Sequence, residues 1–145
     1  MLRQFLLIGA AAAGLMASAP ALAAQDFLVI VNEANETEAI SRNDLAQIFL
    51  KRTTEWSNGS PVVPVDLTES SPVREAFSQS VHGRPVSAMK AHWQRQIFSG
   101  RGVPPVEKAA ESEVIEYVRA NRNAVGYVRN GSSLGSGVRT LRILN

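Results

Sequence analysis

The stretch VVPVDLTESSPVREAF, residues 62–77, decides the fold. It begins with a run of branched apolar residues, Val62 to Val65, which predicts a buried strand. Polar residues follow, and then a helix for which Ser71 is a favoured N-cap residue and Pro72 fits the first helical position. A loop that leads from a strand into a helix start presents unpaired backbone N–H groups, which can bind an anion.

Ser70, Ser71 and Arg74 are the candidate ligand-binding residues of this helix start. Arg74 lies one turn into the helix, where it can add a forked cationic donor to the two hydroxyls. A simpler interpretation is that the Ser-Pro start only satisfies the backbone donors of its own helix. The stretch alone favours the simpler interpretation, so the case for an anion site depends on the rest of the chain.

The N-terminal segment predicts export. Arg3 supplies a positive charge, Phe5 to Met16 form an apolar run, and Ala21-Leu22-Ala23 is a small-x-small cleavage signal. We therefore expect a signal peptide at residues 1–23, cleaved near Ala23, and a periplasmic single domain at residues 24–145. The apolar run is shorter than the ~20 residues of a spanning helix, and no other stretch approaches that length, so we expect no membrane insertion.

Composition limits both the class of fold and the class of partner. The chain has no cysteine, so no disulfide can stabilise an exported domain of this length, which must rely on its hydrophobic core. Its formal net charge is +2, and loss of Arg3 with the signal peptide would leave 14 basic against 13 acidic side chains. The basic residues are dispersed among acidic ones, so the sequence offers little support for a nucleic-acid partner.

The pattern of the mature chain places helices between strands. We expect strands at residues 27–31, 62–65, 125–128 and 138–144, and helices that begin at Ser41, at Ser71, at Val86 and at Ser112. The continuously apolar first strand is typical of a parallel sheet covered on both faces. This order predicts an α/β fold, a three-layer sandwich around a mostly parallel sheet. Ligands of such sheets lie beyond the carboxyl ends of the strands, where Ser70 and Ser71 are expected.

Two aromatic segments are expected to contribute packing. Trp56 lies in the polar connection before residue 62 and is interpreted as a lid over the core. In the helix at residues 86–98, four large side chains fall on one helical face, which we expect to pack in the core: Met89, Trp93, Ile97 and Phe98.

Several motifs together resemble the phosphate-binding proteins of ABC transporters. They are Ser-Arg-x-x-Leu-Ala-x-Ile-Phe-Leu-Lys-x-x-x-x-Trp at residues 41–56, Pro64-Val65, Ser71-x-x-Arg74-x-x-Phe77, and Ala-Val-Gly-Tyr-Val at residues 124–128. The family has similar stretches, including Ser-Gly-Thr-x-x-x-Phe at the phosphate-contacting serine, onto which Ser71 falls. The resemblance implies one lobe of a type II periplasmic-binding-protein-like fold, with phosphate or a related oxyanion as ligand and an ABC permease or another envelope protein as partner.

The chain departs from the family pattern at the expected site. Pro72 replaces the family's glycine and removes an N–H, and Val73 replaces its threonine and removes a hydroxyl. Asp66 or Leu67 lies where the family often carries an arginine, and a carboxylate there would repel an anion. Members of the family have two lobes and about twice the length of the mature chain, so one face of the binding cleft is expected to be missing here. A single lobe would then bind the ion weakly or share it with a second chain. Whether the chain dimerises is left open.

No pattern in the sequence favours catalysis or a cofactor. His82 and His92 lack the spacing of a helical metal pair, and there is no Gly-x-Ser-x-Gly elbow around a serine. Gly100-Arg101-Gly102 follows a predicted helix and lacks the remaining spacing of a dinucleotide motif. We therefore expect no enzyme activity, no catalytic residue, no metal and no cofactor.

Two functions remain open. In the first, an exported solute-binding domain recognises phosphate or a related oxyanion weakly at the helix start. In the second, the domain is a ligand-free periplasmic interaction module of the same fold, with an exposed apolar patch around Trp56 or Trp93.

Overall fold

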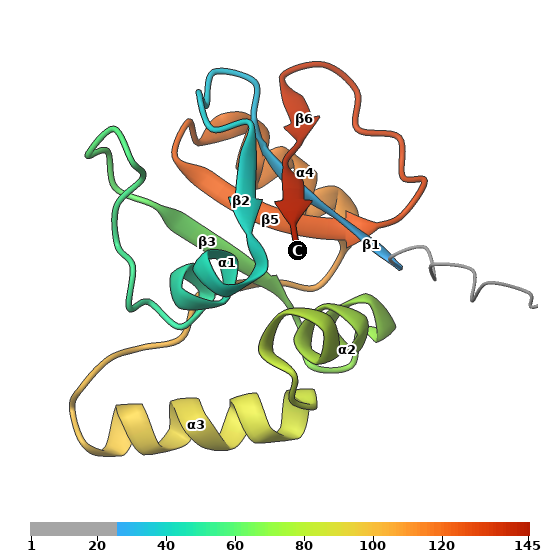
Figure 1. Ribbon diagram of the computed structural model, residues 1–145. Helices are drawn as coiled ribbons and strands as arrows, with labels where there is room; N and C mark the ends of the chain where they lie inside the picture. Colours follow the sequence, from blue (N-terminus) through green and yellow to red (C-terminus); the bar gives the residue numbers. More distant parts are fainter. Residues whose placement is uncertain (1–25) are drawn as a thin grey trace, which may run out of the picture.

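The computed structural model describes residues 26–145 as an α/β fold built on one main sheet (Figure 1). The signal peptide predicted at residues 1–23 lies outside the described residues. The elements in chain order are β1 (Phe27–Asn32), β2 (Ala39–Ser41), α1 (Arg42–Phe49), β3 (Val63–Leu67), α2 (Pro72–Phe77), the π-helical turn η1 (Ser78–His82), α3 (Val86–Phe98), β4 (Val106–Lys108), α4 (Glu111–Ala120), β5 (Ala124–Arg129), β6 (Val138–Thr140) and β7 (Arg142–Leu144).

The main sheet has the strand order β4-β3-β5-β1-β6. β3 pairs in parallel with β4 and β5, whereas β1 pairs antiparallel with both β5 and β6. Four of the five strands therefore run in one direction, which confirms the mostly parallel sheet. The expectation for β1 itself was wrong in direction, because an apolar run indicates burial on both faces and says nothing of which way the strand runs.

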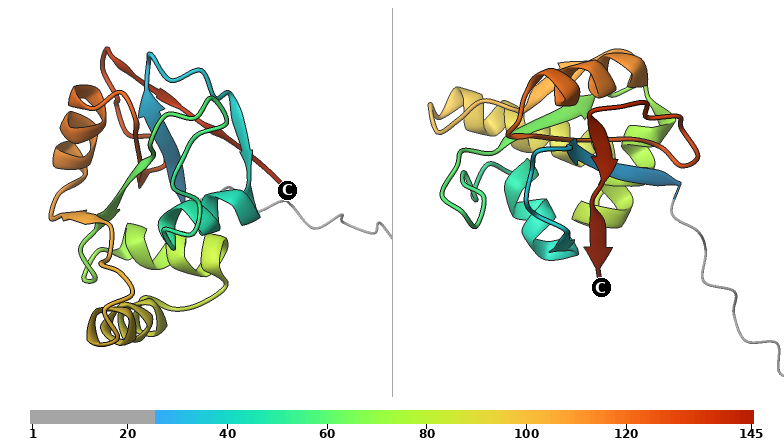
Figure 2. Two further views of the ribbon diagram at one scale, coloured as in Figure 1. Left: turned by 90° about the vertical axis from the view of Figure 1, so that its left-hand side faces the viewer. Right: turned by 90° about the horizontal axis from the view of Figure 1, so that it is seen from above.

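Helices cover both faces of the sheet, which confirms the three layers. α4 lies on one face, and α1 and α2 lie on the other (Figure 2). Adjacent residues of β5 show the two faces. A Cβ on Gly126 would lie 2.6 Å from Cγ1 of Val114, so only glycine lets α4 approach this closely, while the ring of Tyr127 stacks on Phe77 at 3.9 Å on the opposite face.

The helix starts are set by local hydrogen bonds. Ser41 caps α1 as expected, because its Oγ accepts a hydrogen bond from the backbone N–H of Asp44 at 3.0 Å. The expectation that Ser112 caps the fourth helix was wrong. α4 begins one residue earlier, at Glu111, and Ala110 precedes it without a side-chain cap.

Two short strands, β2 and β4, were not expected from the sequence. β2 pairs with β7 in a separate parallel sheet, and β4 pairs with β3 in the main sheet. The stretch at residues 138–144, expected as one strand, divides at Leu141 between the two sheets. Strands of three residues are too short to show a period, and here their pairing partners are distant in sequence.

α3 has the expected bounds but packs at the edge of the molecule, below α1 and α2 in Figure 1. Met89 and Trp93 are buried, as expected. Ile97 is 53% exposed and Phe98 is 94% exposed, so the expectation that these two pack in the core was wrong. Trp56 is buried and its indole N–H donates to the carbonyl of Asn123 at 3.1 Å, consistent with a packing lid.

None of the helices within residues 26–145 has the length and apolar character needed to cross a bilayer.

Candidate functional site

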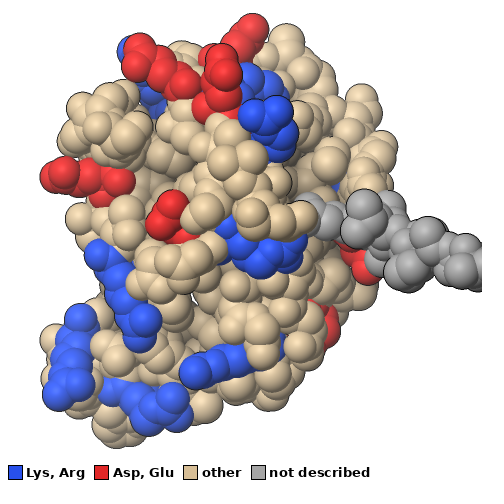
Figure 3. All heavy atoms as spheres, viewed as in Figure 1, with Lys and Arg blue, Asp and Glu red and all other residues tan. Residues whose placement is uncertain are grey.

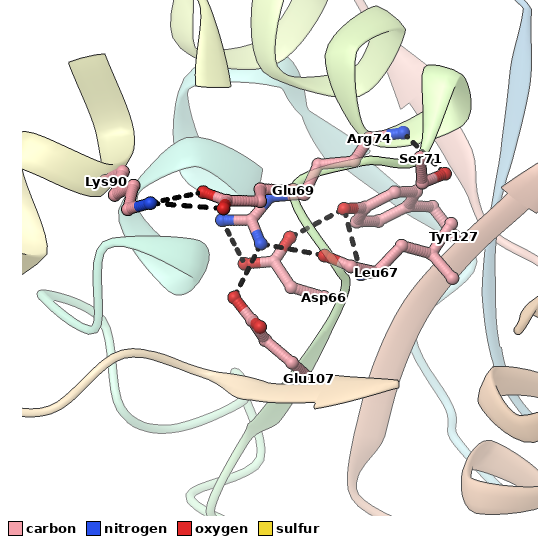
Figure 4. Close-up of polar contacts among 8 residues, drawn as sticks. All are labelled: Asp66, Leu67, Glu69, Ser71, Arg74, Lys90, Glu107 and Tyr127. Atoms are coloured by element: carbon pink, nitrogen blue, oxygen red, sulfur yellow. Dashed lines mark hydrogen bonds and ion pairs between the residues drawn. The ribbon is translucent and has the colours of Figure 1, made fainter. Parts of the chain in front are cut away.

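The candidate site begins where β3 ends and α2 starts (Figure 4). Ser71 has an extended backbone, and its Oγ accepts a hydrogen bond from the backbone N–H of Arg74 at 3.3 Å. Pro72 occupies the first helical position, as the sequence predicts. Strand, loop and helix start therefore have the predicted arrangement.

Few backbone donors remain unpaired at this helix start. Pro72 has no N–H, that of Arg74 is taken by the Ser71 side chain, and that of Glu75 donates to the Ser71 carbonyl at 3.2 Å. The N–H of Ser71 donates to the Thr68 carbonyl at 3.0 Å. Among the described residues at the start of α2, the N–H of Val73 is the donor left without a partner. A single N–H gives an anion much less than the several donors of an open helix start.

The guanidinium of Arg74 turns inward and is held by the protein itself. Its Nη1 donates to the Leu67 carbonyl and to Oε1 of Glu107, both at 2.7 Å, and its Nη2 lies 3.8 Å from Oδ2 of Asp66. The residue is only 6% exposed. The cation of the predicted site therefore serves as an internal partner of two carboxylates and a carbonyl.

A buried hydrogen-bond chain extends from this arginine to the core. The Tyr127 hydroxyl donates to Oδ1 of Asp66 at 2.7 Å and accepts from the N–H of Leu67 at 3.2 Å. Burial raises the pKa of Asp66 from its ordinary 3.8 to about 6, against the lowering effects of Arg74 and of the Tyr127 hydrogen bond. Burial also raises the pKa of Tyr127 well above its ordinary value, and the Asp66 carboxylate adds to that rise. We call Asp66, Arg74, Glu107 and Tyr127 the Arg74 network.

The charge of the Arg74 network is unfavourable for an anion. Burial acts to lower the pKa of Arg74, but the carboxylates of Asp66 and Glu107 outweigh it, so the guanidinium stays charged. Above about pH 6 two carboxylates therefore surround one cation. The nearby Lys90 is also paired, with Glu69 at 3.0 Å. An oxyanion at the helix start would meet a net negative environment.

The three predicted site residues lie around the start of α2, with Ser70 and Ser71 before the helix and Arg74 within it, but they differ in exposure. Ser70 is exposed, Ser71 is half-buried and Arg74 is buried. The sequence did indicate that a carboxylate at Asp66 would oppose an anion, and that carboxylate is present beside Arg74.

Two members of the network were missed. Glu107 lies in β4, a three-residue strand that the sequence did not predict, and nothing in the sequence shows that β4 pairs with β3. Tyr127 was part of a predicted strand and of the motif at residues 124–128, with no role given to its hydroxyl. A hydroxyl in a buried run must find a partner, and that requirement was a usable signal.

No cluster of three or more His, Asp or Glu side chains suited to a metal ion occurs within residues 26–145.

The family comparison agrees with the architecture. A family model described as a PBP superfamily domain matches residues 9–141. The chain belongs to the PBP superfamily. A search among curated proteins gives no match.

Solved structures similar to this PBP-superfamily chain share its fold at low sequence identity. An ABC-type phosphate transport receptor from Vibrio cholerae has a TM-score of 0.62 at 21% identity, over 81% of this chain and 46% of that one. A protein from Clostridium perfringens, described as a phosphate ABC transporter substrate-binding protein with bound phosphate, has a TM-score of 0.65 at 18% identity. The match covers 81% of this chain and 44% of that one. PstS from Borrelia burgdorferi has a TM-score of 0.58 at 17% identity, over 81% of this chain and 47% of that one. The chain thus spans less than half the length of the structures it matches, and it has the fold of one part of a phosphate-binding protein.

Proposed function

We propose that this chain is an exported, periplasmic interaction module of the PBP superfamily, which docks a partner protein through α3 and does not close around an ion at Ser71. The observation that carries the proposal is the state of Arg74. Its guanidinium is committed to Glu107, Asp66 and the Leu67 carbonyl, so the cation needed at an oxyanion site instead stabilises the domain.

The docking surface is the exposed apolar end of α3. Four large apolar side chains here are open to solvent: Ile97 at 53%, Phe98 at 94%, Val103 at 62% and Val106 at 40%. Ile97 also lines a groove of about 440 Å³, which we call the α3 groove. Its other apolar walls include Val86, Trp93 and Pro104, and its charged lining residues are Glu69, Arg74, Lys90 and Glu107. An apolar patch beside a groove is typical of a protein-binding surface. The patch lies near Trp93, although Trp56 and Trp93 themselves are buried.

The charges around this surface indicate the chemistry of the partner. Over α3, at the bottom of Figure 3, the coloured side chains are all Lys or Arg. Arg95 and Arg101 have no ion-pair partner among the described residues. Glu69 and Glu107 also line the groove, but they are paired with Lys90 and Arg74. The partner that fits the unpaired Arg95 and Arg101 is therefore a protein with an apolar centre and an acidic rim. An envelope protein, including a permease, can offer such a surface.

Site-specific crosslinking tests this proposal. The photoreactive residue p-benzoylphenylalanine replaces Phe98 in the full chain, expressed in its own cell envelope, with the same residue at Arg122 as the control position. We expect one crosslinked protein from position 98, identified by mass spectrometry and then purified, and none from position 122. Calorimetry of the pure pair should show binding that Phe98→Asp abolishes while the melting temperature of the domain is unchanged. Equal crosslinking from both positions, or binding that survives Phe98→Asp, would refute the proposal.

Weak oxyanion recognition at Ser70, Ser71 and Arg74 is the second candidate. It is supported by the unpaired N–H of Val73 and the adjacent serine hydroxyls, and by the fold shared with a phosphate-bound protein. Calorimetry with phosphate and sulfate, on the wild type and on Ser70→Ala, distinguishes it from the first. Heat at millimolar phosphate that Ser70→Ala reduces would favour oxyanion binding, and no heat would exclude it.

A further inference from the structure

A second concave surface shares no lining residue with the α3 groove and has no member of the Arg74 network in its lining. It is a cleft of about 550 Å³ between α1, η1, α3 and the end of β7, and we call it the arginine cleft. Its lining consists of Ser41, Arg42, Asn43, Ala46, Gln47, Leu50, Arg52, Val81, His82, Arg84, Met89, His92, Leu144 and Asn145. None of these is Ser70, Ser71 or Arg74, so the arginine cleft is distinct from the site that the sequence predicted.

The charged side chains that line the arginine cleft are all cationic at pH 7. They are three arginines, with no Asp or Glu, and the two histidines of the lining are neutral at this pH because their pKa values are lowered. Within residues 26–145, the ion pairs involve other basic residues, and Arg52 and Arg84 also have no hydrogen-bonded partner for their side chains. Arg42 is held in place by neutral groups, since it donates to Ser80 and, at 3.0 Å, to Oδ1 of Asn145. Three guanidinium charges therefore share one concave surface.

The acidic residue next to the arginine cleft does not neutralise it. Asp44 follows Ser41 and Asn43 in the first turn of α1 but is not part of the lining. Its Oδ2 accepts a hydrogen bond from the Ser41 hydroxyl at 2.7 Å.

The arginine cleft also has an apolar floor. Ala46 and Leu50 from α1, Val81 from η1, Met89 from α3 and Leu144 from β7 line it together with the cations. Its volume falls within the range of pockets that hold whole organic ligands, roughly 300–1,000 Å³, and is far larger than one inorganic ion needs. The combination of a cationic mouth and an apolar floor therefore suits a ligand with two chemically different ends.

We propose that the arginine cleft binds an organic anion, with a phosphate or carboxylate head paired to Arg52 and Arg84 and an apolar body on Leu50, Val81 and Met89. Arg52 and Arg84 are exposed, so each guanidinium can donate two parallel hydrogen bonds to an anionic head. Arg42 is half-buried and fixed by its neutral partners, so it supplies a positive charge deeper in the arginine cleft. This inference is independent of the docking function proposed for α3.

The histidines report the same positive potential. The pKa of His92 is lowered by burial and then by Arg52, Arg95 and Arg84. The pKa of His82 is lowered to about 4, mainly by burial and then by Arg74, which lies outside the arginine cleft, and by Arg84 and His92. A bound anion would offset these charges, so binding should raise the pKa of His92. This change can be followed by NMR independently of any measurement of affinity.

The test uses 1-naphthyl phosphate as probe, with inorganic phosphate and 1-naphthol as its separate halves. In fluorescence titrations of the full mature chain at pH 7, 1-naphthyl phosphate should bind at least about tenfold more tightly than either half, because only the whole probe meets both the cations and the apolar floor. Equal affinity for inorganic phosphate would mean a bare oxyanion site. Equal affinity for 1-naphthol would mean simple apolar adsorption. Either result would overturn the proposal.

Charge variants locate the binding. The double substitution Arg52→Gln with Arg84→Gln should weaken 1-naphthyl phosphate by about tenfold or more and remove the ligand-induced rise in the His92 pKa. Arg122→Gln removes the same charge outside the arginine cleft and should change neither quantity. Because these side chains are exposed, all variants should keep the wild-type melting temperature. A double variant that binds as wild type, or an equal loss in Arg122→Gln, would contradict the proposal.

Discussion

The Arg74 network and the arginine cleft use the same cation in opposite ways. Arg74 comes from the segment that the sequence marks most clearly as an anion site, yet Glu107 and Asp66 hold its guanidinium inside the domain. The sequence predicted no anion site at Arg52 or Arg84, and none of the described carboxylates pairs with either side chain. The availability of an arginine for a ligand is therefore decided by which acidic side chains the fold brings next to it, and much less by its local motif.

The largest expected difference between the two regions is in stability. Arg74→Met removes the cation from two carboxylates, one of them buried, and should lower the free energy of unfolding by about 3–5 kcal/mol at pH 8, as for other broken buried pairs. Arg84→Met should change it by less than about 0.5 kcal/mol, since that side chain is exposed. Urea unfolding of both variants measures the contrast. The loss of unfolding free energy in Arg74→Met should be smaller at pH 5, where Asp66 can be protonated. Similar losses in Arg74→Met and Arg84→Met would contradict the expected difference between the two regions.

The next largest expected effect is on the pH dependence of stability, where Asp66 of the Arg74 network and His82 of the arginine cleft act in opposite directions. The folded-state pKa of Asp66 is raised to about 6, so the folded state binds more protons than the unfolded state from about pH 4 to 6, and this contribution to stability falls as pH rises. The pKa of His82 is lowered to about 4, so its contribution rises between about pH 4 and 6.5. Each shift corresponds to about 3 kcal/mol.

Because the two contributions oppose each other, the wild type should show a shallow dependence over this range. Asp66→Asn should leave a stability that rises from pH 4 to 6.5, and His82→Gln one that falls from pH 4 to 6. Urea unfolding at half-unit pH steps separates the three profiles. Variants that keep the slope of the wild type would show that neither group titrates as described.

A smaller effect is expected from the hydroxyl that closes the Arg74 network. Tyr127→Phe keeps the stacked ring but removes the donor to Asp66 and the acceptor for the Leu67 N–H, both buried. The cost should be about 1–3 kcal/mol, as for other buried groups left without a partner. Thermal and urea unfolding measure it. A neutral result would mean that water takes the place of the hydroxyl.

The smallest expected effect lies in the arginine cleft and is electrostatic. Arg84→Gln removes one of the charges that lower the pKa of His92, so that pKa should rise in an NMR titration while stability stays within about 0.5 kcal/mol. Arg122→Gln is the matched control and should leave the pKa of His92 unchanged. An unshifted His92 in Arg84→Gln would show that the cations of the cleft do not act on one another.

The sequence predicted the parts of the fold that local patterns determine. The cap at Ser41, the Ser-Pro start at Ser71 and the bounds of α3 were all found as expected, because capping and helical spacing act within a few residues. The direction of β1, the short strands β2 and β4, and the division of residues 138–144 between β6 and β7 depend on pairing between distant segments, for which the local pattern carries no information.

The same limit applies to the candidate site. Residues 62–77 were enough to predict the helix start and the opposing carboxylate at Asp66. The inward orientation of Arg74 depends on Glu107, which lies in β4, 33 residues further along the chain. The arginine cleft gathers its lining from α1, η1, α3 and β7, and no single stretch shows the excess of positive charge. Dispersed basic residues in the sequence became a local concentration only after folding.

The stacked rings of Phe77 and Tyr127 give this domain a built-in optical probe. The pKa of the Tyr127 phenol lies well above its ordinary value, so this phenol should stay protonated in alkaline solutions in which a tyrosine free in water ionises. Phenolate absorbance from Tyr127 should therefore appear only together with loss of the near-ultraviolet circular dichroism of the stacked pair. An absorbance titration would then report the opening of the core without any added label.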